Sequence, residues 1–436
     1  MTEEIKNRIE SIRKGEIPKG YRYTKDIGIA PTDWKLGKMS DIIENISRPV
    51  PKPDKPYWRL GIKSWAKGTF HTFVDNPDTV DMDELYEVKE NDLIVNITFA
   101  WEHAIAIAKK EDEGLLVSHR FPTYVFKDGQ IPEYYQAVIS QQYFKDMLDH
   151  ISPGGAGRNR VLNRKDFLNL PCYIPSLVEQ RKIAEVLSTC DRVIELKQQL
   201  LDEKHKQKQW LMQILLDPDS CVRLPGFEDS TWQTATISSL FTFGSSLAKS
   251  RDELSDEGDL YLHYGDIHAN SRYYIDAKAE YALIPKYDGT SLNKTHLRTG
   301  DVVFVDASED YEGISKFVVI ENCDGFIFIS GLHTLPCHSR DDRLTLHFKR
   351  YCFQTYSFKN QMAFYANGMK VYGISEKDFE KIIISFPDHE EQTAIADVLD
   401  TISMNIELLK NEIAEIAQKK KALMQLLLTG LVRTNN

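Results

Sequence analysis

The chain has 436 residues, of which 42% are hydrophobic and 27% charged, a composition typical of a globular protein of about two to four domains. No apolar run approaches the roughly 18–20 residues that span a bilayer, and the charged N-terminus lacks the apolar segment of a signal peptide, so we expect a cytoplasmic protein. The six scattered cysteines form no Cys-x-x-Cys pair, which argues against a zinc site or a disulfide framework. The net charge of −11 disfavours nucleic acid as a partner, although a total charge does not describe local patches.

The first part of the chain predicts a polar, helical extension at 1–30 followed by an α+β domain at 31–174. A stretch rich in proline, glycine and polar residues separates the two, and the domain opens around Trp34. Short β-like runs and a helical stretch together indicate the α+β class. The runs lie at 93–97, 115–118 and 123–126, and the helical stretch at 133–148.

A single long helix is predicted at 175–217. Pro175 leads into it, and Glu179 lies in the first turn, where the helix dipole favours negative charge. The pattern ends at Asp217-Pro218. About 38 residues at about 1.5 Å each would form a rod of about 57 Å.

A linker at 218–230 leads to a second predicted α+β domain at 231–386. It opens around Trp232 as the first domain opens around Trp34. Its β-like runs lie at 302–305, 317–320 and 326–329.

The second long helix, predicted at 387–430 and followed by a tail at 431–436, repeats the first. The segment PSLVEQRKIAEVL from Pro175 returns without a gap as PDHEEQTAIADVL from Pro387, 212 positions later. Leu-Met-Gln also recurs, at 211–213 and 423–425. Self-similarity at a fixed offset indicates an internal duplication, and hence a pseudo-twofold repeat of domain and helix.

The second helix carries a seam of mostly apolar residues that alternates steps of four and three, typical of a coiled coil. The first helix has the same register, with Lys197, Lys204 and Lys208 in its middle. We favour an antiparallel pair within the chain over two independent core helices or a homodimer. The lysines then either extend past the partner helix to water, which we favour, or face DNA or an acidic partner. The seam consists of Ile395, Leu399, Ile402, Ile406, Leu409, Ile413, Ile416, Lys420, Leu423 and Leu427.

These features resemble the specificity subunits of type I restriction-modification systems. The resemblance covers nearly all of 31–430 and rests on the repeated IP-x-x-x-EQ-x-x-IA-x-VL helix openings, on the tryptophan openings of both domains, and on Tyr264-Gly-Asp-Ile267, which is similar to a strand-end motif of the family. The first domain has Leu60-Gly-Ile-Lys63 in place of that motif, and residues 1–30 precede the usual start of the family.

The resemblance implies two α+β target recognition domains separated by two long antiparallel helices. Each domain would read one half of a bipartite double-stranded DNA site. The helices would set the distance between the half-sites and dock two modification subunits, which methylate adenine with S-adenosylmethionine. Two restriction subunits would use ATP and Mg, while this chain would hold no metal, cofactor or catalytic residue. The partner-docking residues implied are Glu179, Gln180, Ile183, Leu187, Glu391, Gln392, Ile395 and Leu399.

Candidate DNA contacts come from basic residues beside glycine-bearing turns, where backbone can approach a duplex and arginine can bind guanine or phosphate. The loop at 154–160 is the best of these in the first domain, and Arg158 corresponds at the 212-residue offset to Lys370. A solvated surface charge is the alternative for each, and Trp65 is more typical of a core residue than of a base contact. The candidates are Lys63, Trp65, Lys67, Arg120, Arg158, Asn159, Arg160 and Arg164 in the first domain, and Lys249, Arg251, His268, Arg272, Lys294, Lys316 and Lys370 in the second.

Two other classes of function remain as alternatives. An intrinsic enzyme is disfavoured because Asn76-Pro-Asp78 fails as an adenine methyltransferase loop, and because Tyr21 follows the Gly15–Gly20 spacing where a P-loop needs lysine. The compact Asp378-Phe-Glu-Lys381 reads as helix surface rather than a nuclease site. A coiled-coil adaptor without sequence-specific DNA binding, or a specificity subunit of a modification-only system, would share the same architecture.

Overall fold

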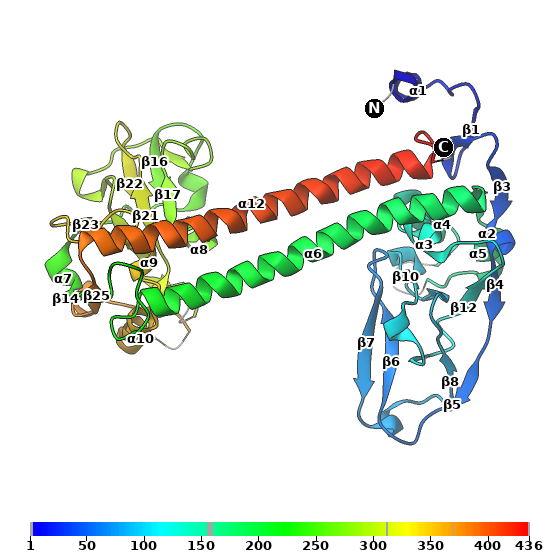
Figure 1. The fold of residues 1–436 in the computed structure, drawn as a ribbon, viewed down its shortest axis with the longest axis horizontal. Coiled ribbons are helices and arrows are strands. Elements are labelled where there is room, and N and C mark those ends of the chain that lie inside the picture. Colours follow the sequence, from blue (N-terminus) through cyan, green and yellow to red (C-terminus); the bar gives the residue numbers. More distant parts are fainter. Residues whose placement is uncertain (1–2, 155–159, 311–312, 369, 435–436) are drawn as a thin grey trace. The chain divides into compact units, whose positions relative to one another are not determined.

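The computed structural model describes residues 3–154, 160–310, 313–368 and 370–434. The chain divides into two compact units, Met1–Gln198 with Glu412–Asn436, and Gln199–Asn411. Each unit contains one α+β domain together with one end of each long helix, α6 (Leu177–Leu215) and α12 (His389–Leu428) (Figure 1). The helices have 39 and 40 residues, as the repeated sequence predicts.

Unit 1 contains a four-stranded sheet in the order β10-β9-β12-β4 and a five-stranded sheet in the order β5-β8-β11-β6-β7. All pairs in them are antiparallel except β11 with β6. Two small sheets, β1-β2 and β13-β3, complete the unit. Its remaining helices and turns are α1 (Glu3–Arg13), α2 (Met39–Ile42), η1 (Pro77–Thr79), η2 (Ala100–Glu102), η3 (Lys110–Asp112), α3 (Pro132–Ile139), α4 (Gln142–His150) and α5 (Arg164–Asn169). Its strands are β1 (Tyr21–Thr24), β2 (Gly28–Pro31), β3 (Lys35–Lys38), β4 (Ile43–Ile46), β5 (Pro49–Pro51), β6 (Tyr57–Ile62), β7 (Thr69–Val74), β8 (Glu84–Glu87), β9 (Leu93–Val95), β10 (Ile105–Ile107), β11 (Leu116–Val117), β12 (Thr123–Phe126) and β13 (Pro171–Ile174).

Unit 2 contains a five-stranded sheet in the order β15-β23-β19-β21-β17 and a three-stranded sheet in the order β18-β16-β22, with small sheets β14-β25 and β20-β24. Its strands are β14 (Gln233–Thr236), β15 (Phe241–Phe243), β16 (Asp259–Leu262), β17 (Tyr274–Asp276), β18 (Lys286–Tyr287), β19 (Val302–Val305), β20 (Ala307–Ser308), β21 (Phe317–Glu321), β22 (Phe328–Ser330), β23 (Thr334–Ser339), β24 (Tyr372–Gly373) and β25 (Ile383–Phe386). Its helices and turns besides α6 and α12 are α7 (Ile237–Leu240), η4 (Arg251–Glu253), α8 (Tyr264–Ala269), η5 (Asn293–Thr295), η6 (Gly313–Ser315), α9 (Lys349–Cys352), α10 (Tyr356–Tyr365) and α11 (Glu376–Phe379).

The predicted strands all occur, with ends that differ by up to two residues. The helix expected at 133–148 is two helices, α3 and α4, because Gln141 has an extended backbone (φ −76°, ψ 150°) that ends one and caps the other. The segment after β16 that resembles a strand-end motif opens a short helix, α8.

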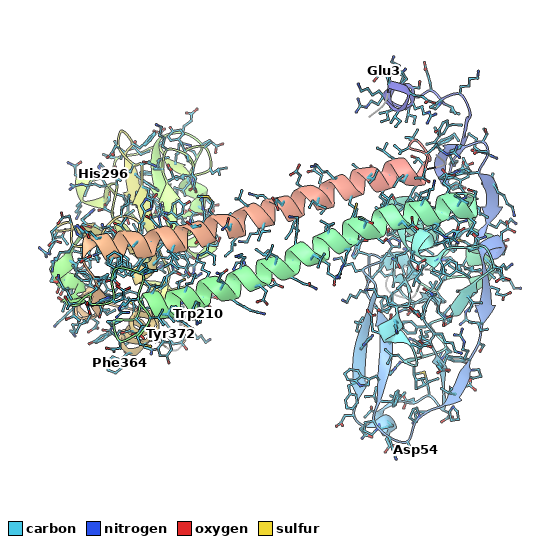
Figure 2. All side chains as sticks on the ribbon, viewed as in Figure 1. Glu3, Asp54, Trp210, His296, Phe364 and Tyr372 are labelled. Carbon is cyan, nitrogen blue, oxygen red and sulfur yellow. The ribbon has the colours of Figure 1, made fainter. Side chains whose placement is uncertain are left out.

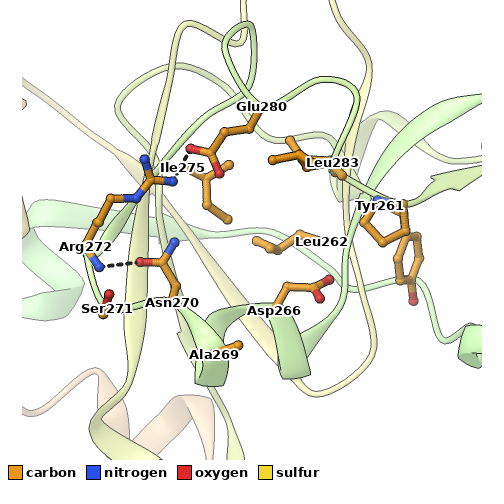
Figure 3. Close-up of a pocket in the computed structure, with 12 residues that line it drawn as sticks. Tyr261, Leu262, Asp266, Ala269, Asn270, Ser271, Arg272, Ile275, Glu280 and Leu283 are labelled. Atoms are coloured by element: carbon orange, nitrogen blue, oxygen red, sulfur yellow. Dashed lines mark hydrogen bonds and ion pairs between the residues drawn. The ribbon is translucent and has the colours of Figure 1, made fainter. Parts of the chain in front are cut away.

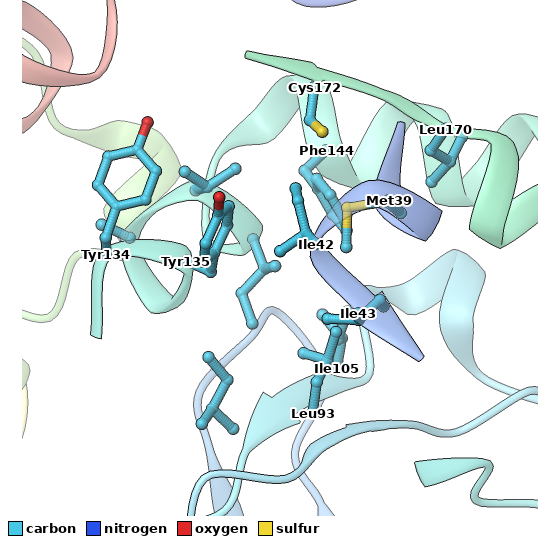
Figure 4. Packing of buried hydrophobic residues seen from close by; sticks show 14 of the residues in the cluster. Met39, Ile42, Ile43, Leu93, Ile105, Tyr134, Tyr135, Phe144, Leu170 and Cys172 are labelled. Atoms are coloured by element: carbon cyan, nitrogen blue, oxygen red, sulfur yellow. The ribbon is translucent and has the colours of Figure 1, made fainter. Parts of the chain in front are cut away.

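The long helices belong to the cores of both domains. In unit 1, Ile183 and Leu187 of α6 and Leu427 of α12 pack into a cluster with residues of α2, α3, α4, β9 and β10, part of which Figure 4 shows. In unit 2, Ile395 and Leu399 of α12 occupy the equivalent places. Each domain therefore buries the first turns of one helix and the last turns of the other. The members that Figure 4 labels are Met39, Ile42, Ile43, Leu93, Ile105, Tyr134, Tyr135, Phe144, Leu170 and Cys172.

The seam predicted from the heptads is the buried side of both helices. Every seam residue of α12 is buried or half-buried. The three lysines of the α6 seam are half-buried too, and Lys197 Nζ lies 2.6 Å from Glu412 Oε2, within unit 1. In unit 2, Lys208 Nζ lies 5.8 Å from the Tyr351 ring, and burial lowers the pKa of this lysine. These positions agree with lysines that extend beside the partner helix.

In unit 1, residues that precede β3 are bonded to residues that follow α12. The Tyr21 hydroxyl donates to the carbonyl of Gly430 (2.7 Å), and Arg8 donates to the carbonyl of Leu431 (3.2 Å). Arg433 binds both Asp33 (2.8 Å) and Glu179 (2.8 Å). Arg8 and Tyr21 therefore contact the residues that directly follow α12.

A buried glutamine at the start of each long helix joins that helix to its own domain. Gln180 accepts the N–H of Ile131 (3.1 Å) and donates to the carbonyl of Pro175 (3.0 Å). Gln392 accepts the N–H of Thr345 (2.8 Å) and donates to the carbonyls of Pro387 (2.9 Å) and Arg343 (2.7 Å). In both copies one side-chain amide thus bonds the backbone that leads into the helix and the backbone of a domain loop. We call this pair of contacts the joint. A glutamine side chain suits it because its amide can donate and accept at the same time.

We expect Gln392→Leu to lower the free energy of unfolding of unit 2 by about 1–3 kcal/mol, because it keeps the side-chain volume but leaves buried backbone groups without partners. Urea denaturation of the full chain measures this. Gln418→Leu, the same change at an exposed position of α12, is the matched control and should stay near wild type. Equal stability of the two variants would contradict a role for the Gln392 amide.

Candidate nucleic-acid interface

In unit 1 the loop between β9 and β10, residues 96–104, gathers three other loops. The N–H of Trp65 donates to the carbonyl of Glu102 (2.9 Å), which fixes the β6–β7 turn against it. The N–H of Ile97 donates to the carbonyl of Arg120 (3.0 Å), and the N–H of Leu162 donates to the carbonyl of Ile97 (2.8 Å). Candidate residues far apart in the sequence are therefore neighbours around one loop.

Most cations of this cluster point to solvent. Lys63, Lys67 and Arg120 are exposed, and Arg164 donates to the carbonyl of His119 (2.7 Å). Trp65 is 58% exposed rather than a core residue, and Lys145 Nζ lies 4.3 Å from the centre of its ring.

Arg160 is already engaged within the chain. It forms an ion pair with Asp149 (2.9 Å), donates to the carbonyl of Ser152 (2.9 Å) and lies 5.4 Å from the ring of Trp101. Arg160 links its own segment to Asp149, Ser152 and Trp101. It therefore has a structural role in addition to its positive charge. The candidates Arg158 and Asn159 lie outside the described residues.

Sequence reasoning missed the aromatic residues of the β9–β10 loop. Phe99 is 39% exposed, and Trp101 lies half-exposed on η2. The loop is held by His103, which is buried and bonded through Nε2 to the carbonyl of Ile139 (2.6 Å). Burial lowers the pKa of His103, so this imidazole is neutral at pH 7. The sequence feature that could have indicated these aromatic residues is the Thr-Phe-Ala-Trp stretch at 98–101, which lies between two short buried strands.

The corresponding loop of unit 2 joins β19 to β21 and also gathers distant segments. Strand β20 within it pairs with β24, which brings in the segment that carries Lys370. Asp306 Oδ1 lies 3.3 Å from His333 Nδ1, and Lys316 Nζ lies 5.7 Å from the Tyr273 ring. A Cβ on Gly313 would come within 2.8 Å of the His268 ring, so this glycine permits the close approach of loop and α8.

Imidazoles surround Tyr264 beside that loop. The tyrosine ring lies 5.9 Å from His268 and 5.7 Å from His333, both edge-on, and 4.6 Å from His263. Burial, with a contribution from Lys316, lowers the pKa of His268, so at pH 7 the imidazole is neutral and can both donate and accept. The groups around the β19–β21 loop of unit 2 are therefore imidazoles and carboxylates. The groups around the β9–β10 loop of unit 1 are lysine, arginine and indole side chains.

The other candidates of unit 2 are mostly engaged within the chain. Arg251 binds Asp266 (2.7 Å) on α8, and Lys249 binds Glu253 (2.9 Å). Lys294 is exposed, and no described contact brings it to the β19–β21 loop. Phe364, which sequence reasoning missed, is 80% exposed at the end of α10, close in sequence to exposed Lys370 (Figure 2).

Arg272 borders a cavity of about 290 Å³ instead of the β19–β21 loop (Figure 3). Its guanidinium forms an ion pair with Glu280 (2.5 Å), and its backbone N–H donates to the side chain of Asn270 (2.8 Å). Asp266, which also lines the cavity, is bound by Arg251. These polar groups are paired inside the chain, which indicates a structural role for the cavity.

The residues expected to dock a partner are interior residues of this chain. The eight side chains, from Glu179 to Leu187 and from Glu391 to Leu399, are at most 5% exposed. Glu179 accepts the indole N–H of Trp34 (2.8 Å), and Glu391 accepts the hydroxyl of Ser230. Direct contact with a partner is incompatible with this burial, because the side chains already bind their own domains. They position the helices, and a docking surface has to use exposed neighbours.

Within the described residues no group of His, Cys, Asp and Glu could hold a metal ion. None of the described helices is long and apolar enough to cross a membrane.

The comparisons with known proteins agree with this architecture. A family model described as "Type I restriction modification DNA specificity domain" matches twice, at residues 31–203 and 229–418. The putative type I restriction enzyme MjaX specificity subunit of Methanocaldococcus jannaschii is 24% identical over 94% of this chain and 96% of its own. The MjaVIII specificity subunit of the same organism is 22% identical over 93% and 94%.

Solved structures share the fold. A chain from a type I restriction-modification system, studied for complex assembly and conformational transition, has a TM-score of 0.57 at 15% identity and covers 93% of this chain and 99% of its own. The type I restriction-modification S subunit from M. genitalium has a TM-score of 0.52 at 13% identity, with 93% and 97% covered. The two matches of the family model span both domains and most of both helices, so this chain belongs to the type I restriction-modification DNA specificity family and confers DNA specificity without being an enzyme itself.

Proposed function

We propose that each unit reads one half of a bipartite double-stranded DNA site through the loop at its central hairpin, β9–β10 in unit 1 and β19–β21 in unit 2. The observation that carries this proposal is the convergence of distant basic and aromatic side chains on the β9–β10 loop. Exposed lysine and arginine supply phosphate contacts, and side chains at the loop read base edges. The sequence candidates that lie around these loops, with Phe99, Trp101 and Phe364 added, form the proposed surface. We propose the cytoplasm as the location of the chain.

The two units differ in the chemistry that they offer to bases. Arginine pairs with guanine through O6 and N7, and aromatic side chains contact the thymine methyl group. Carboxylates accept from the amino group of cytosine, and unit 2 has the exposed Glu309 and half-exposed Asp306 in its loop. The proposed half-sites are therefore different sequences.

We also propose one docking site for a modification subunit in each unit. In unit 2, a groove of about 370 Å³ runs between α6 and α12, and apolar atoms of its lining side chains make up most of its surface. At the 212-residue offset, Val398 and Thr401 of this groove correspond to Val186 and Thr189 in unit 1, and both threonines donate to the carbonyl four residues earlier (2.7 Å). We therefore propose the surface around Val186 and Thr189 as the counterpart of this groove in unit 1. The groove is lined by Lys204, Gln207, Leu211, Asp397, Val398, Thr401, Ile402 and Asn405.

In this proposal the chemistry belongs to the partners. Two modification subunits carry S-adenosylmethionine and methylate adenine, and two restriction subunits use ATP and Mg to move and cut DNA. A modification-only system remains the second candidate, because this chain offers the same surfaces in either case.

The first test maps methylated adenines by long-read sequencing in cells that express this chain with its modification subunit. We expect one bipartite motif with a fixed gap. Trp101→Ala with Arg120→Ala should alter only one half of it, and Glu309→Gln only the other half. A motif that changes in both halves with either variant, or in neither, would contradict the assignment of one half-site to each unit.

A second test measures the salt dependence of DNA affinity in the complex of this chain with its modification subunits. Lys63→Gln with Lys67→Gln should lower the slope of log K against log salt by about 1.8, because each phosphate contact contributes about 0.9. The control pair is Lys109→Gln with Lys110→Gln, since these exposed lysines lie at the opposite end of β10 from the loop. Equal slopes for the two pairs would exclude the turn from the DNA surface.

A third test counts modification subunits by light scattering of the purified complex. Thr401→Arg should block the groove of unit 2 and Thr189→Arg its counterpart, so each variant should retain one modification subunit and the double variant none. Gln418→Arg, on an exposed face of α12, is the control. Two bound subunits in the double variant would place docking elsewhere.

A further inference from the structure

The five-stranded sheet of unit 1 has one open edge, strand β7 (Figure 1). This strand has six residues, whereas every other edge strand in the described residues has two to four. A long edge strand presents unpaired backbone donors and acceptors that can pair with another strand.

Strand β7 lacks the features that protect sheet edges. At the opposite edge, β5 reads Pro49-Val-Pro51, and proline cannot donate to a further strand. Strand β7 reads TFHTFV from Thr69, with no proline, lysine or carboxylate. Four of its six residues are exposed. One edge of this sheet is blocked and the other is open to pairing.

The backbone groups that face the open edge can be assigned. The N–H of Lys63 donates to the carbonyl of Gly68 (2.9 Å), so this pair is hydrogen-bonded across the hairpin. Hydrogen-bonded and non-bonded pairs alternate along an antiparallel ladder. With Arg59 opposite Thr72, Thr72 bonds to β6, while Thr69, His71 and Phe73 direct their N–H and C=O groups outward.

Exposed aromatic side chains flank this edge on both faces of the sheet. On one face the rings of Trp58 and Phe73 are 5.0 Å apart, and the residues are 50% and 48% exposed. On the other face Phe70, 43% exposed, covers Gly61, where a Cβ would come within 2.2 Å of the ring. Burial of such rings is the main gain that an added strand would provide.

We propose that β7 pairs with β7 of a second copy of this chain, antiparallel about a twofold axis at Thr72. Residues 70, 72 and 74 share one face and 69, 71 and 73 the other, so this register keeps both faces continuous. Phe70 then lies opposite Val74 of the second copy, and His71 lies opposite Phe73. In this register Asp75 lies opposite Thr69 of the second copy, two positions from Lys67, so the antiparallel arrangement places opposite charges diagonally near each other at each end. This self-complementarity in apolar pattern and charge favours a second copy over a foreign strand.

A cysteine at the twofold position tests the register directly. Thr72 forms a non-hydrogen-bonded pair with its counterpart, the arrangement in which opposite side chains are closest. Thr72→Cys in a Cys221→Ser background, which removes the exposed native cysteine, should give a covalent dimer of the full chain under oxidised glutathione. Thr231→Cys in the same background, exposed and outside any strand, is the control for random collision.

The solution mass tests the association without a cross-link. In sedimentation at rising concentration, the wild type should move toward twice the 50.2 kDa of one chain. Phe73→Lys places a charge on the edge and should raise the dissociation constant of the dimer by at least about tenfold. A circular-dichroism spectrum and melting temperature like those of the wild type would show that this variant folds.

Three results would overturn the proposal. They are a wild type that stays monomeric, a Thr72→Cys chain that cross-links no more than the control, and a folded Phe73→Lys chain that still dimerises. If either cysteine cross-linking or the Phe73→Lys variant gave the contradicting result, any dimer would have to form through another surface. None of these measurements depends on DNA or on modification subunits, so they are independent of the proposed half-site recognition.

Discussion

The structure of each unit depends on the buried Glu-Gln pair at the start of its long helix. The amide of Gln180 or Gln392 bonds both the backbone leading into the helix and a loop of the domain. Inside a core, an unpaired amide or carbonyl is costly, so these bonds favour the observed arrangement of helix and domain. Because the joint uses backbone groups of the domain, the domain side chains can differ between the copies while the joint stays the same.

The two joints differ in the groups that bind the neighbouring glutamate. Glu179 binds Trp34 and Arg433, and Arg433 also binds Asp33, so Arg433 is fixed in unit 1. Glu391 has Ser230 in that place, and the indole N–H of Trp232 is buried without a protein partner among the described residues. Tyr21 and Arg8 add to this asymmetry, since they donate to the carbonyls of Gly430 and Leu431.

The negative net charge of the chain is compatible with a DNA surface because many carboxylates are used inside the fold. In unit 2, Glu321 and Asp400 are both bound by Arg350, which also lies 4.1 Å from the Tyr274 ring, and His347 lies 2.8 Å from Asp400. Such carboxylates contribute little repulsion at the loops. In unit 1, by contrast, the cations at the β6–β7 turn are exposed, so local charge and total charge have opposite signs there.

The sequence by itself determined the duplication, both long helices with their seam, the α+β class of both domains and the family, because these depend on periodicity and on a motif repeated at a fixed offset. Tertiary structure decided which side chains meet. Trp65 is on the surface because the β6–β7 turn is bonded to the β9–β10 loop, and the guanidinium of Arg272 is already paired because Glu280 lies beside it. The Glu-Gln motif marks the helices in the sequence, yet only packing shows that it faces inward. Local pattern encodes helices and strands, whereas the role of a charged or aromatic side chain depends on partners far away along the chain.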